Sequence, residues 1–297
     1  MDSDPLKLSD EQALNSGFFD WIVERHEVYR KRAAGLPFEK WTDDEILKRY
    51  KFTNPFREND SETMWMRQHL KPDDPADATL TNNIMNAALF RMIGTRHFAE
   101  VFLREHGWIT PHNYNQDMLI SIIDDLLERK QKCFTGAYII TNQGIKARKS
   151  KVVIGSFITG LYCQVYHEPN VKKLVTFSRQ QQFQEWLMKF RGFGGGGFMA
   201  YEVVCDITHM PLMHGSTPAT WLLDRYTWGN AGPGALRGLN RVWGKPLTSG
   251  FGAPATSLRK MQVLHDMKDL LHDLSSEYNY KHIDLCDVDM RCIEHCL

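Results

Sequence analysis

Three things that this sequence lacks narrow the class of protein. It has no apolar run of the roughly 18 residues that a membrane-spanning helix needs. Cysteine is scarce, with six in 297 residues, which is too few and too scattered for a disulfide scaffold. Net charge is absent, because 36 lysines and arginines balance 36 aspartates and glutamates. No global positive field draws the chain to nucleic acid or to an anionic membrane, so any DNA binding must come from a local patch.

The first residues also lack a signal-peptide pattern. Residues 1–12 are acidic, whereas a signal peptide begins basic and continues apolar. Scattered cysteines are reduced thiols by default. The sequence therefore predicts a soluble, cytoplasmic protein with no membrane partner.

What the chain does have is enough apolar surface for a full core, with 42% apolar and 11% aromatic positions. The apolar side chains recur at the spacing of a helix in five stretches, which are 9–34, 84–93, 119–127, 183–190 and 264–274. Two further stretches, 136–141 and 151–158, are instead rich in β-branched residues and are typical of strands. We predict a mainly α fold with at most a small β-ribbon.

The domain organisation predicted from this pattern is simple. No internal repeat, heptad array or linker rich in proline or serine divides the chain. We predict an N-terminal helical extension over residues 1–40 and one helical domain over residues 41–297.

A local basic stretch supplies the patch that the net charge hides. Residues 129–151 carry seven lysines and arginines and no acidic residue, while the residues after His265 carry eight carboxylates against three basic groups. Lys146, Arg148, Lys149 and Lys151 are therefore predicted to bind DNA. The alternative is an exposed loop whose charges serve only solubility.

Glycine is concentrated in one unusual segment, residues 190–204. An amphipathic helix runs there into a cluster of glycines and then into a second apolar segment, a pattern that favours a helix-hairpin-helix. Because the first amides of a helix point outward at the positive end of its dipole, such a hairpin can bind phosphate. We expect Gly192, Gly194, Gly196 and Gly197 to contact DNA. A close crossing of two helices would explain the same glycines.

A second glycine segment, residues 229–240, follows Asp224. It could present another set of inward-pointing amides, with an arginine nearby as a forked anion donor. A simple turn at Pro233 and Gly234 would explain the same residues.

Taken alone, the hairpin followed by Asp224 resembles the helix-hairpin-helix DNA glycosylases, in which a glycine hairpin grips phosphate and a downstream aspartate lines the base pocket. Lyase-type members have a lysine where this chain has Phe198, so no Schiff base can form at that position. Five segments taken in order resemble more closely the alpha-glutamyl/putrescinyl thymine pyrophosphorylase family, the amino acid:DNA transferases of bacteriophages with hypermodified thymidine. They are KRYKFTNPFREND (48–60), FTGAYIITNQG (134–144), GFGGGGFMAYEVVCD (192–206), AGPGALRGLN (231–240) and LCDVD (285–289).

This resemblance implies a DNA-glycosylase-like helical fold, shared with the helical domain of 5-hydroxymethyluracil DNA kinases, and a base-hypermodifying activity. An amino acid amine would displace pyrophosphate from the 5-methylene of 5-pyrophosphoryloxymethyl-uracil in double-stranded DNA. The partners would be that DNA and a free amino acid, and the target base would be flipped out of the duplex. The sequence has no P-loop, which argues against the kinase activity itself.

The chemistry implied by the resemblance assigns roles to particular residues. Asp224 is the candidate to accept the amine proton or to stabilise positive charge on the methylene. Asn54 suits hydrogen bonding to the base edge and Arg57 suits anion binding, with Asp60 orienting Arg57. The candidates for the leaving pyrophosphate are Gly232, Gly234 and Arg237.

Structural alternatives exist for these residues. Asp224 could cap a helix or pair with Arg225, and the group around Arg57 could be a buried polar network. No motif specifies a metal site or any cofactor, although Mg²⁺ could share the charge of the pyrophosphate.

Two other functions are consistent with the sequence. A monofunctional DNA glycosylase that excises a modified thymine or uracil would leave an abasic site rather than a heavier base. A DNA-binding module without catalysis would be favoured if Asp224 were buried and paired, with no pocket beside it.

Overall fold

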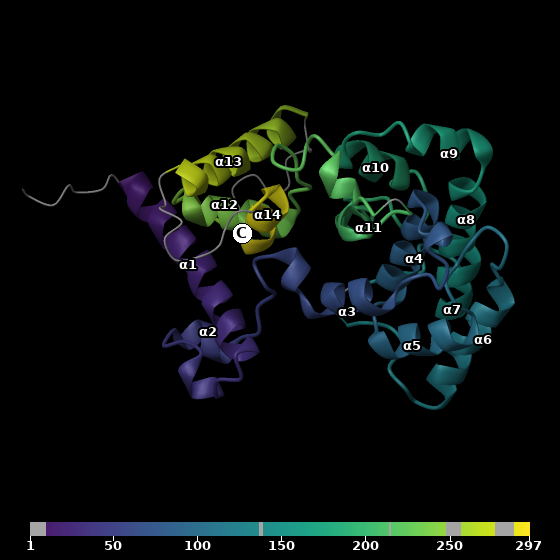
Figure 1. Cartoon of the computed structure of the whole chain (residues 1–297). Helices are drawn as coiled ribbons and strands as arrows, with labels where there is room; N and C mark the ends of the chain where they lie inside the picture. The colour runs from purple at the N-terminus through teal and green to yellow at the C-terminus, as the bar shows by residue number, and fades with distance from the viewer. Residues whose placement is uncertain (1–9, 137–138, 214, 248–256, 277–287) are drawn as a thin grey trace, which may run out of the picture. The chain divides into compact units, whose positions relative to one another are not determined.

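The computed structural model describes residues 10–136, 139–213, 215–247, 257–276 and 288–297, and within these ranges it contains helices and no strand (Figure 1). The prediction of a mainly α fold is confirmed. Contacts between residues divide the chain into two compact units, one of residues 1–60 and 225–297 and the other of residues 61–224. The predicted domain boundary at residue 40 is not tested by these contacts and stays a prediction.

The unit of residues 61–224 is built around a helix with no exposed face. All 14 residues of α4 (Leu80–Ile93) are buried, and the other helices of the unit pack around it. The Thr79 hydroxyl accepts from the Asn82 amide at its N-terminus, and Gly94 ends it with a φ of 73°. Because a positive φ costs glycine nothing, this C-cap is the ordinary stop signal of a helix.

The unit contains further helices before and after α4. In chain order they are α3 (Ser61–His69), η3 (Pro75–Asp77), α5 (Arg96–Glu105), α6 (Gln116–Glu128), α7 (Lys149–Val152), η4 (Val153–Ile158), α8 (Thr159–Val165), α9 (Glu168–Leu174), α10 (Gln180–Leu187), α11 (Phe198–His209) and η5 (Pro218–Thr220). The expected helices over 84–93, 119–127 and 183–190 correspond to α4, α6 and α10, which confirms these three predictions.

The strand expected over residues 151–158 is wrong. The segment lies in a continuous helical stretch from α7 through the π-helical η4 to α8. Its buried side chains include Ile154, Ile158, Leu161 and Val165, which recur every three or four residues. A longer window shows this helical period, whereas the eight-residue window is dominated by β-branched residues. In the other expected strand, residues 137 and 138 lie outside the described residues, and the described positions of 136–141 form no strand.

The second unit joins the two ends of the sequence around its own apolar core. Its helices are α1 (Asp10–Ala33), η1 (Phe38–Lys40), α2 (Glu45–Arg49), η2 (Arg57–Asn59), α12 (Pro233–Val242), α13 (Ser257–Ser276) and α14 (Met290–Cys296). Phe18, Phe19 and Ile22 of α1 pack in one cluster with apolar side chains of α12, α13 and α14. The helices predicted over 9–34 and 264–274 are thus α1 and part of α13.

The contact between α12 and α14 depends on one glycine. A Cβ atom on Gly238 would lie 2.2 Å from the main-chain oxygen of Leu297. The two backbones approach too closely for any larger residue, so Gly238 in the second glycine segment has a packing role.

Candidate functional site

The segment of residues 180–209 is a helix, a glycine-rich turn and a second helix, as the sequence predicts. Gly197 begins α11 with a φ of 77°, and a Cβ atom there would lie 2.7 Å from Nε2 of Gln184 on α10. The same Gln184 nitrogen donates to the Gly197 carbonyl over 3.2 Å. The turn is therefore attached to α10 by a side chain that leaves no room for a methyl group.

The four glycines expected to contact DNA differ in their surroundings. Gly196 is exposed, Gly192 and Gly194 are half-buried, and Gly197 is buried. Gly192 has a φ of 92°, and a Cβ atom on it would lie 2.7 Å from the Phe157 ring. Packing thus accounts for Gly192 and Gly197, while the DNA-binding role of all four stays a prediction.

Asp224 is buried and accepts hydrogen bonds at the start of α10. One of its carboxylate oxygens accepts from the Gln180 amide over 2.7 Å and the other from the Gln181 amide over 3.1 Å. A carboxylate in this position satisfies amides that have no partner within the helix and lies at the positive end of the helix dipole. The capping alternative for Asp224 is confirmed, and its catalytic role stays a prediction.

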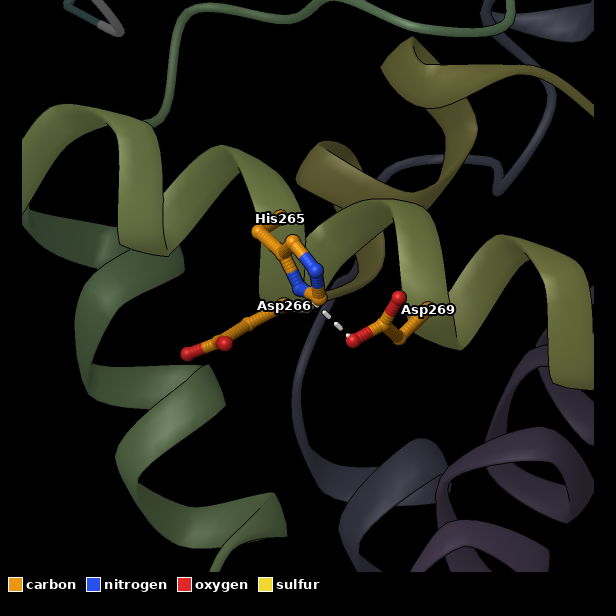
Figure 2. A group of neighbouring side chains, drawn as sticks. All are labelled: His265, Asp266 and Asp269. Carbon is orange, nitrogen blue, oxygen red and sulfur yellow. Dashed lines mark ion pairs between the residues drawn. The ribbon is translucent and has the colours of Figure 1, made fainter.

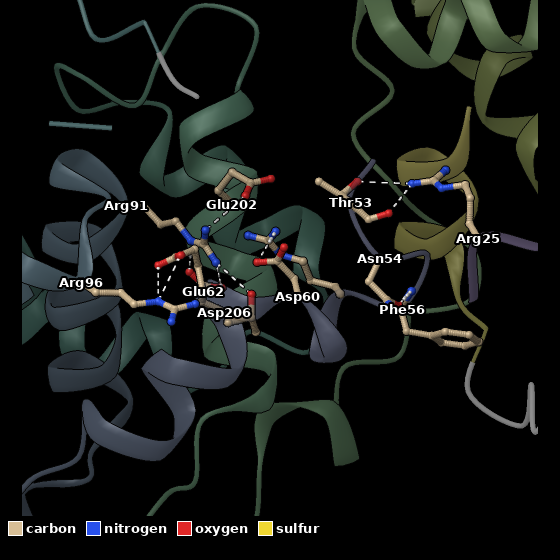
Figure 3. Close-up of polar contacts among 12 residues, drawn as sticks. Arg25, Thr53, Asn54, Phe56, Asp60, Glu62, Arg91, Arg96, Glu202 and Asp206 are labelled. Carbon is tan, nitrogen blue, oxygen red and sulfur yellow. Dashed lines mark hydrogen bonds and ion pairs between the residues drawn. The ribbon is translucent and has the colours of Figure 1, made fainter. Parts of the chain in front are cut away.

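The segment around Asn54 forms local hydrogen bonds and an ion pair. Asn54 Oδ1 accepts from the Phe56 amide over 2.8 Å, as Figure 3 shows. Arg57 is buried, and its Nη1 lies 3.6 Å from Oδ2 of Asp60. The expected contact of Asp60 with Arg57 is thus present, and its role in orienting the guanidinium group stays a prediction. Binding of base or phosphate by Asn54 and Arg57 is not tested by these contacts.

The second glycine segment forms the start of α12. Gly232 is the N-cap residue, Pro233 is the first helical residue, and Arg237 is exposed within the same helix. A proline at this place needs no amide partner and favours the start of a helix. The arrangement explains the Gly-Pro-Gly sequence locally, and binding of pyrophosphate by Gly232, Gly234 and Arg237 stays a prediction.

The basic stretch is exposed near the start of α7. Lys146, Arg148 and Lys151 are exposed, and Arg148 has only a long contact of 3.7 Å with Asp124. The Lys149 ammonium lies 4.3 Å from the centre of the Phe134 ring, a cation–π contact. The four side chains are close in sequence and available to solvent, which is compatible with the predicted DNA contact.

A buried charged group that the sequence did not single out lies between α3, α4 and α11 (Figure 3). Arg91 donates through Nε and Nη2 to the two carboxylate oxygens of Asp206, the second over 2.6 Å, and Nη2 also donates to the Thr63 hydroxyl. Glu202, one turn before Asp206, lies 3.9 Å from Arg91 Nη1. The spacing of Glu202 and Asp206 in an otherwise apolar helix was the signal available in the sequence, because buried carboxylates need a cation.

The sequence offers no metal motif, and one group of possible ligands is exposed on α13 (Figure 2). His265 Nδ1 lies 2.8 Å from Asp269 Oδ2, and Asp266 is beside them. Residues four apart on an exposed helix face pair in this way without an ion. The group therefore does not by itself indicate a metal site.

Comparison with known proteins places the chain in a family. A family model described as the helical domain of 5-hmdU DNA kinase matches residues 12–297. The chain belongs to this family. A 5-hmdU DNA kinase of Bacillus phage SP10 is 24% identical over 240 residues, which is 78% of this chain but 36% of the relative. No solved structure matches.

Family membership relates the chain to phage proteins that modify hydroxymethyluracil in DNA. It confirms the family resemblance found in the sequence. The chain spans about a third, 36%, of the length of the kinase relative. None of the described helices combines the length and the apolar character needed to cross a membrane.

Proposed function

We propose that this helical-domain protein modifies DNA by transferring an amino acid onto an activated thymine-type base. The observation that carries the proposal is the match of the helical domain of 5-hmdU DNA kinase over residues 12–297. The relative is named a kinase, and the proposal assigns to this chain a different step on the same modified base. The five ordered segments shared with the amino acid:DNA transferases support that step.

The proposed reaction is a substitution at the exocyclic methylene of 5-pyrophosphoryloxymethyl-uracil. The amine nitrogen forms a bond to the methylene carbon, the bond from that carbon to oxygen breaks, and pyrophosphate leaves with the electron pair. The ammonium nitrogen must lose one proton before it attacks and the product amine a second if it is to be neutral. The protein must therefore extrude the base, accept a proton and stabilise the charge of the leaving group.

Within this proposal Asp224 accepts the amine proton or stabilises positive charge on the methylene, and Arg237 with Gly232 and Gly234 binds the pyrophosphate. What supports Arg237 is its exposure at the helix that Gly232 begins. What supports Asp224 is its place between the hairpin and the second glycine segment in the family pattern. For the proton to reach Asp224, the carboxylate must share its oxygens with the amides of Gln180 and Gln181.

That same capping geometry favours a second candidate function, a DNA-binding module without catalysis of its own. Because each Asp224 oxygen already accepts a backbone amide, the carboxylate has a structural reason to be present. A helical domain of this kind would hold the modified DNA while another protein performs the chemistry.

Mass spectrometry of nucleosides separates these functions. The protein is incubated with DNA that carries the pyrophosphorylated base and with mixed amino acids, and the DNA is then digested. If the protein is the transferase, pyrophosphate is released. The digest then contains a nucleoside that is heavier than 5-hydroxymethyldeoxyuridine by the mass of one amino acid residue. A glycosylase would release free base and leave abasic sites that hot alkali cleaves. Unchanged nucleosides together with retained DNA binding would support the binding module.

The matched control is DNA with unmodified 5-hydroxymethyluracil. It contains the same methylene without a leaving group, so a transferase leaves it unchanged. Modification of this control DNA would contradict the proposed substitution.

A further inference from the structure

A pocket of about 320 Å³ lies in the unit of residues 1–60 and 225–297, beside the C-terminal half of α1. The segment of residues 38–54 forms its other walls. The volume is within the range of small-molecule sites, and it is large enough for a single nucleotide. Apart from Asn54, none of the residues given a functional role above lines it.

The walls of the pocket are positive. Five cationic side chains line it, those of Arg25, Arg32, Lys48, Arg49 and Lys51, and none of the lining residues in the described structure is acidic. Such a pocket suits an anion. It disfavours a free amino acid, because the ammonium group would have no carboxylate to pair with.

Aromatic rings alternate with these cations and are unusually exposed. Phe38, Tyr50 and Phe52 line the pocket with exposed fractions of 49%, 55% and 40%. The Arg49 guanidinium carbon lies 5.5 Å from the centre of the Tyr50 ring. Exposed rings beside cations are the combination on which nucleobases stack while their phosphates are neutralised.

Hydrogen-bond donors remain unused at the buried side of the pocket. Arg25 is buried, and its Nη2 donates to the Thr53 carbonyl over 2.6 Å (Figure 3). Its Nε and the Nδ2 of Asn54 are buried and have no acceptor within the described part of the chain. Buried donors without partners are costly, and acceptors on a base edge would satisfy them after a small side-chain adjustment.

An adjoining hollow points to a polymer rather than to a free nucleotide. It has a volume of about 610 Å³ and shares Lys48, Arg49 and Tyr50 with the pocket. Ile46 and Glu45 also line it, and the Glu45 carboxylate lies 2.9 Å from the Lys48 ammonium. A strand whose base entered the pocket could continue across these three residues into the hollow.

We propose that this pocket binds one unpaired nucleotide of a DNA strand. The base stacks against the exposed rings, its phosphate pairs with the cations, and the strand continues over Lys48, Arg49 and Tyr50. The proposal does not depend on the transferase reaction, because a DNA-binding module would use the same pocket.

The test measures binding of the full chain to a single-stranded thymidine oligonucleotide with one central 2-aminopurine, whose fluorescence falls when it stacks. Tyr50→Ala should weaken binding at least about fivefold and remove most of the quenching, because stacking of one base contributes roughly 1–3 kcal/mol. Tyr226→Ala is the matched control. Tyr226 is 49% exposed in the same unit and has the Arg225 guanidinium 5.5 Å from its ring, but it does not line the pocket.

The charge of the pocket is tested separately with Lys51→Gln, and Lys268→Gln on the exposed face of α13 is its control. The first substitution should reduce the slope of log affinity against log salt by about 0.7, the value for one phosphate contact on a single strand, and the second should not. Equal behaviour of Tyr50→Ala and Tyr226→Ala, or of the two lysine variants, would overturn the proposal.

Competition identifies the occupant. Thymidine 5′-monophosphate should displace the oligonucleotide from the pocket at a concentration at which inorganic phosphate, at equal ionic strength, does not. Displacement by phosphate alone would mean a simple anion site, and displacement by glutamate as effective as that by the nucleotide would mean an amino acid site. Either result would refute the assignment to a nucleotide.

Discussion

Asp224 has a structural role in the fold and a catalytic role in the proposed reaction. Its carboxylate caps α10 through the amides of Gln180 and Gln181. Asparagine has one acceptor oxygen and can retain one of these two hydrogen bonds, whereas alanine retains neither. This difference separates a structural role from a catalytic one.

We expect Asp224→Asn to keep one of the two capping hydrogen bonds, and so part of their contribution to stability, and to lower turnover at least ~10²-fold, as loss of a general base does. Affinity for DNA should change little. Asp224→Ala should in addition lower the free energy of unfolding by about 1 kcal/mol, because the cap is lost. Single-turnover kinetics and urea unfolding check the two effects. Full activity of the asparagine variant would remove Asp224 from the mechanism.

The buried ion group around Arg91 can be tested by measuring the stability of the protein alone. Arg91→Met leaves the carboxylates of Asp206 and Glu202 without their cation, and breaking a buried pair costs about 3–5 kcal/mol. The control is Arg96→Met, because the contact of Arg96 with Glu62 over 3.1 Å is largely exposed and such pairs contribute about 0–1 kcal/mol. Urea unfolding of both variants measures the difference. Similar midpoints would show that the Arg91 group is not a stabilising unit.

A substitution of Arg237 tests whether this residue recognises the leaving pyrophosphate. Arg237→Ala should impair reaction on pyrophosphorylated DNA while binding of plain DNA stays nearly intact, because its proposed partner exists only on the activated base. Lys245→Ala removes another exposed cation shortly after α12 and serves as the control. Loss of plain-DNA binding in the Arg237 variant would reassign this residue to the DNA backbone.

At the scale of elements, the hairpin between α10 and α11 depends on the glycines at its end. Gly195 and Gly197 both have positive φ, of 68° and 77°, but only a Cβ on Gly197 would meet another residue. Both alanine variants carry the backbone strain, so their difference isolates the clash with the side chains of Gln184 and Met188. We expect Gly197→Ala to be less stable than Gly195→Ala by about 1–3 kcal/mol, the usual cost of overpacking. Thermal and urea unfolding check this, and equal stabilities would mean that these two side chains move aside freely.

At the scale of the whole molecule, the net charge is zero although one surface segment is locally basic. Replacing the four cations Lys146, Arg148, Lys149 and Lys151 by alanine should weaken DNA binding and flatten its salt dependence. Each lost phosphate contact reduces the log–log slope on duplex DNA by about 0.9. The measurement is DNA affinity over a range of salt concentrations.

The control for this variant removes the same charge elsewhere in the same unit. It replaces four other exposed cations, which are Lys71, Arg104, Lys172 and Lys173. The two variants have equal net charge, so a general electrostatic effect changes both slopes alike. A slope that changes equally in both would assign the basic stretch to solvent.

The sequence by itself determined the features that depend on local pattern. Periodic apolar residues predicted α1, α4, α6, α10 and part of α13, and the glycines after α10 predicted the helix-hairpin-helix. Both signals are local, because helix periodicity and turn chemistry act over a few residues. The five ordered segments predicted the family. The segment 151–158 was mistaken for a strand because β-branched residues dominate a short window, whereas the helical period shows only in a longer one.

Only the tertiary structure decided which polar groups meet. Arg91 and Asp206 are far apart in sequence, as are Asp224 and the amides of Gln180 and Gln181. The joining of residues 1–60 with 225–297 into one unit is likewise invisible in any local window. The pocket beside α1 arises because separate short segments place their rings and cations around one space. Such contacts depend on how the chain closes long loops, and a single sequence carries no local signal for that closure.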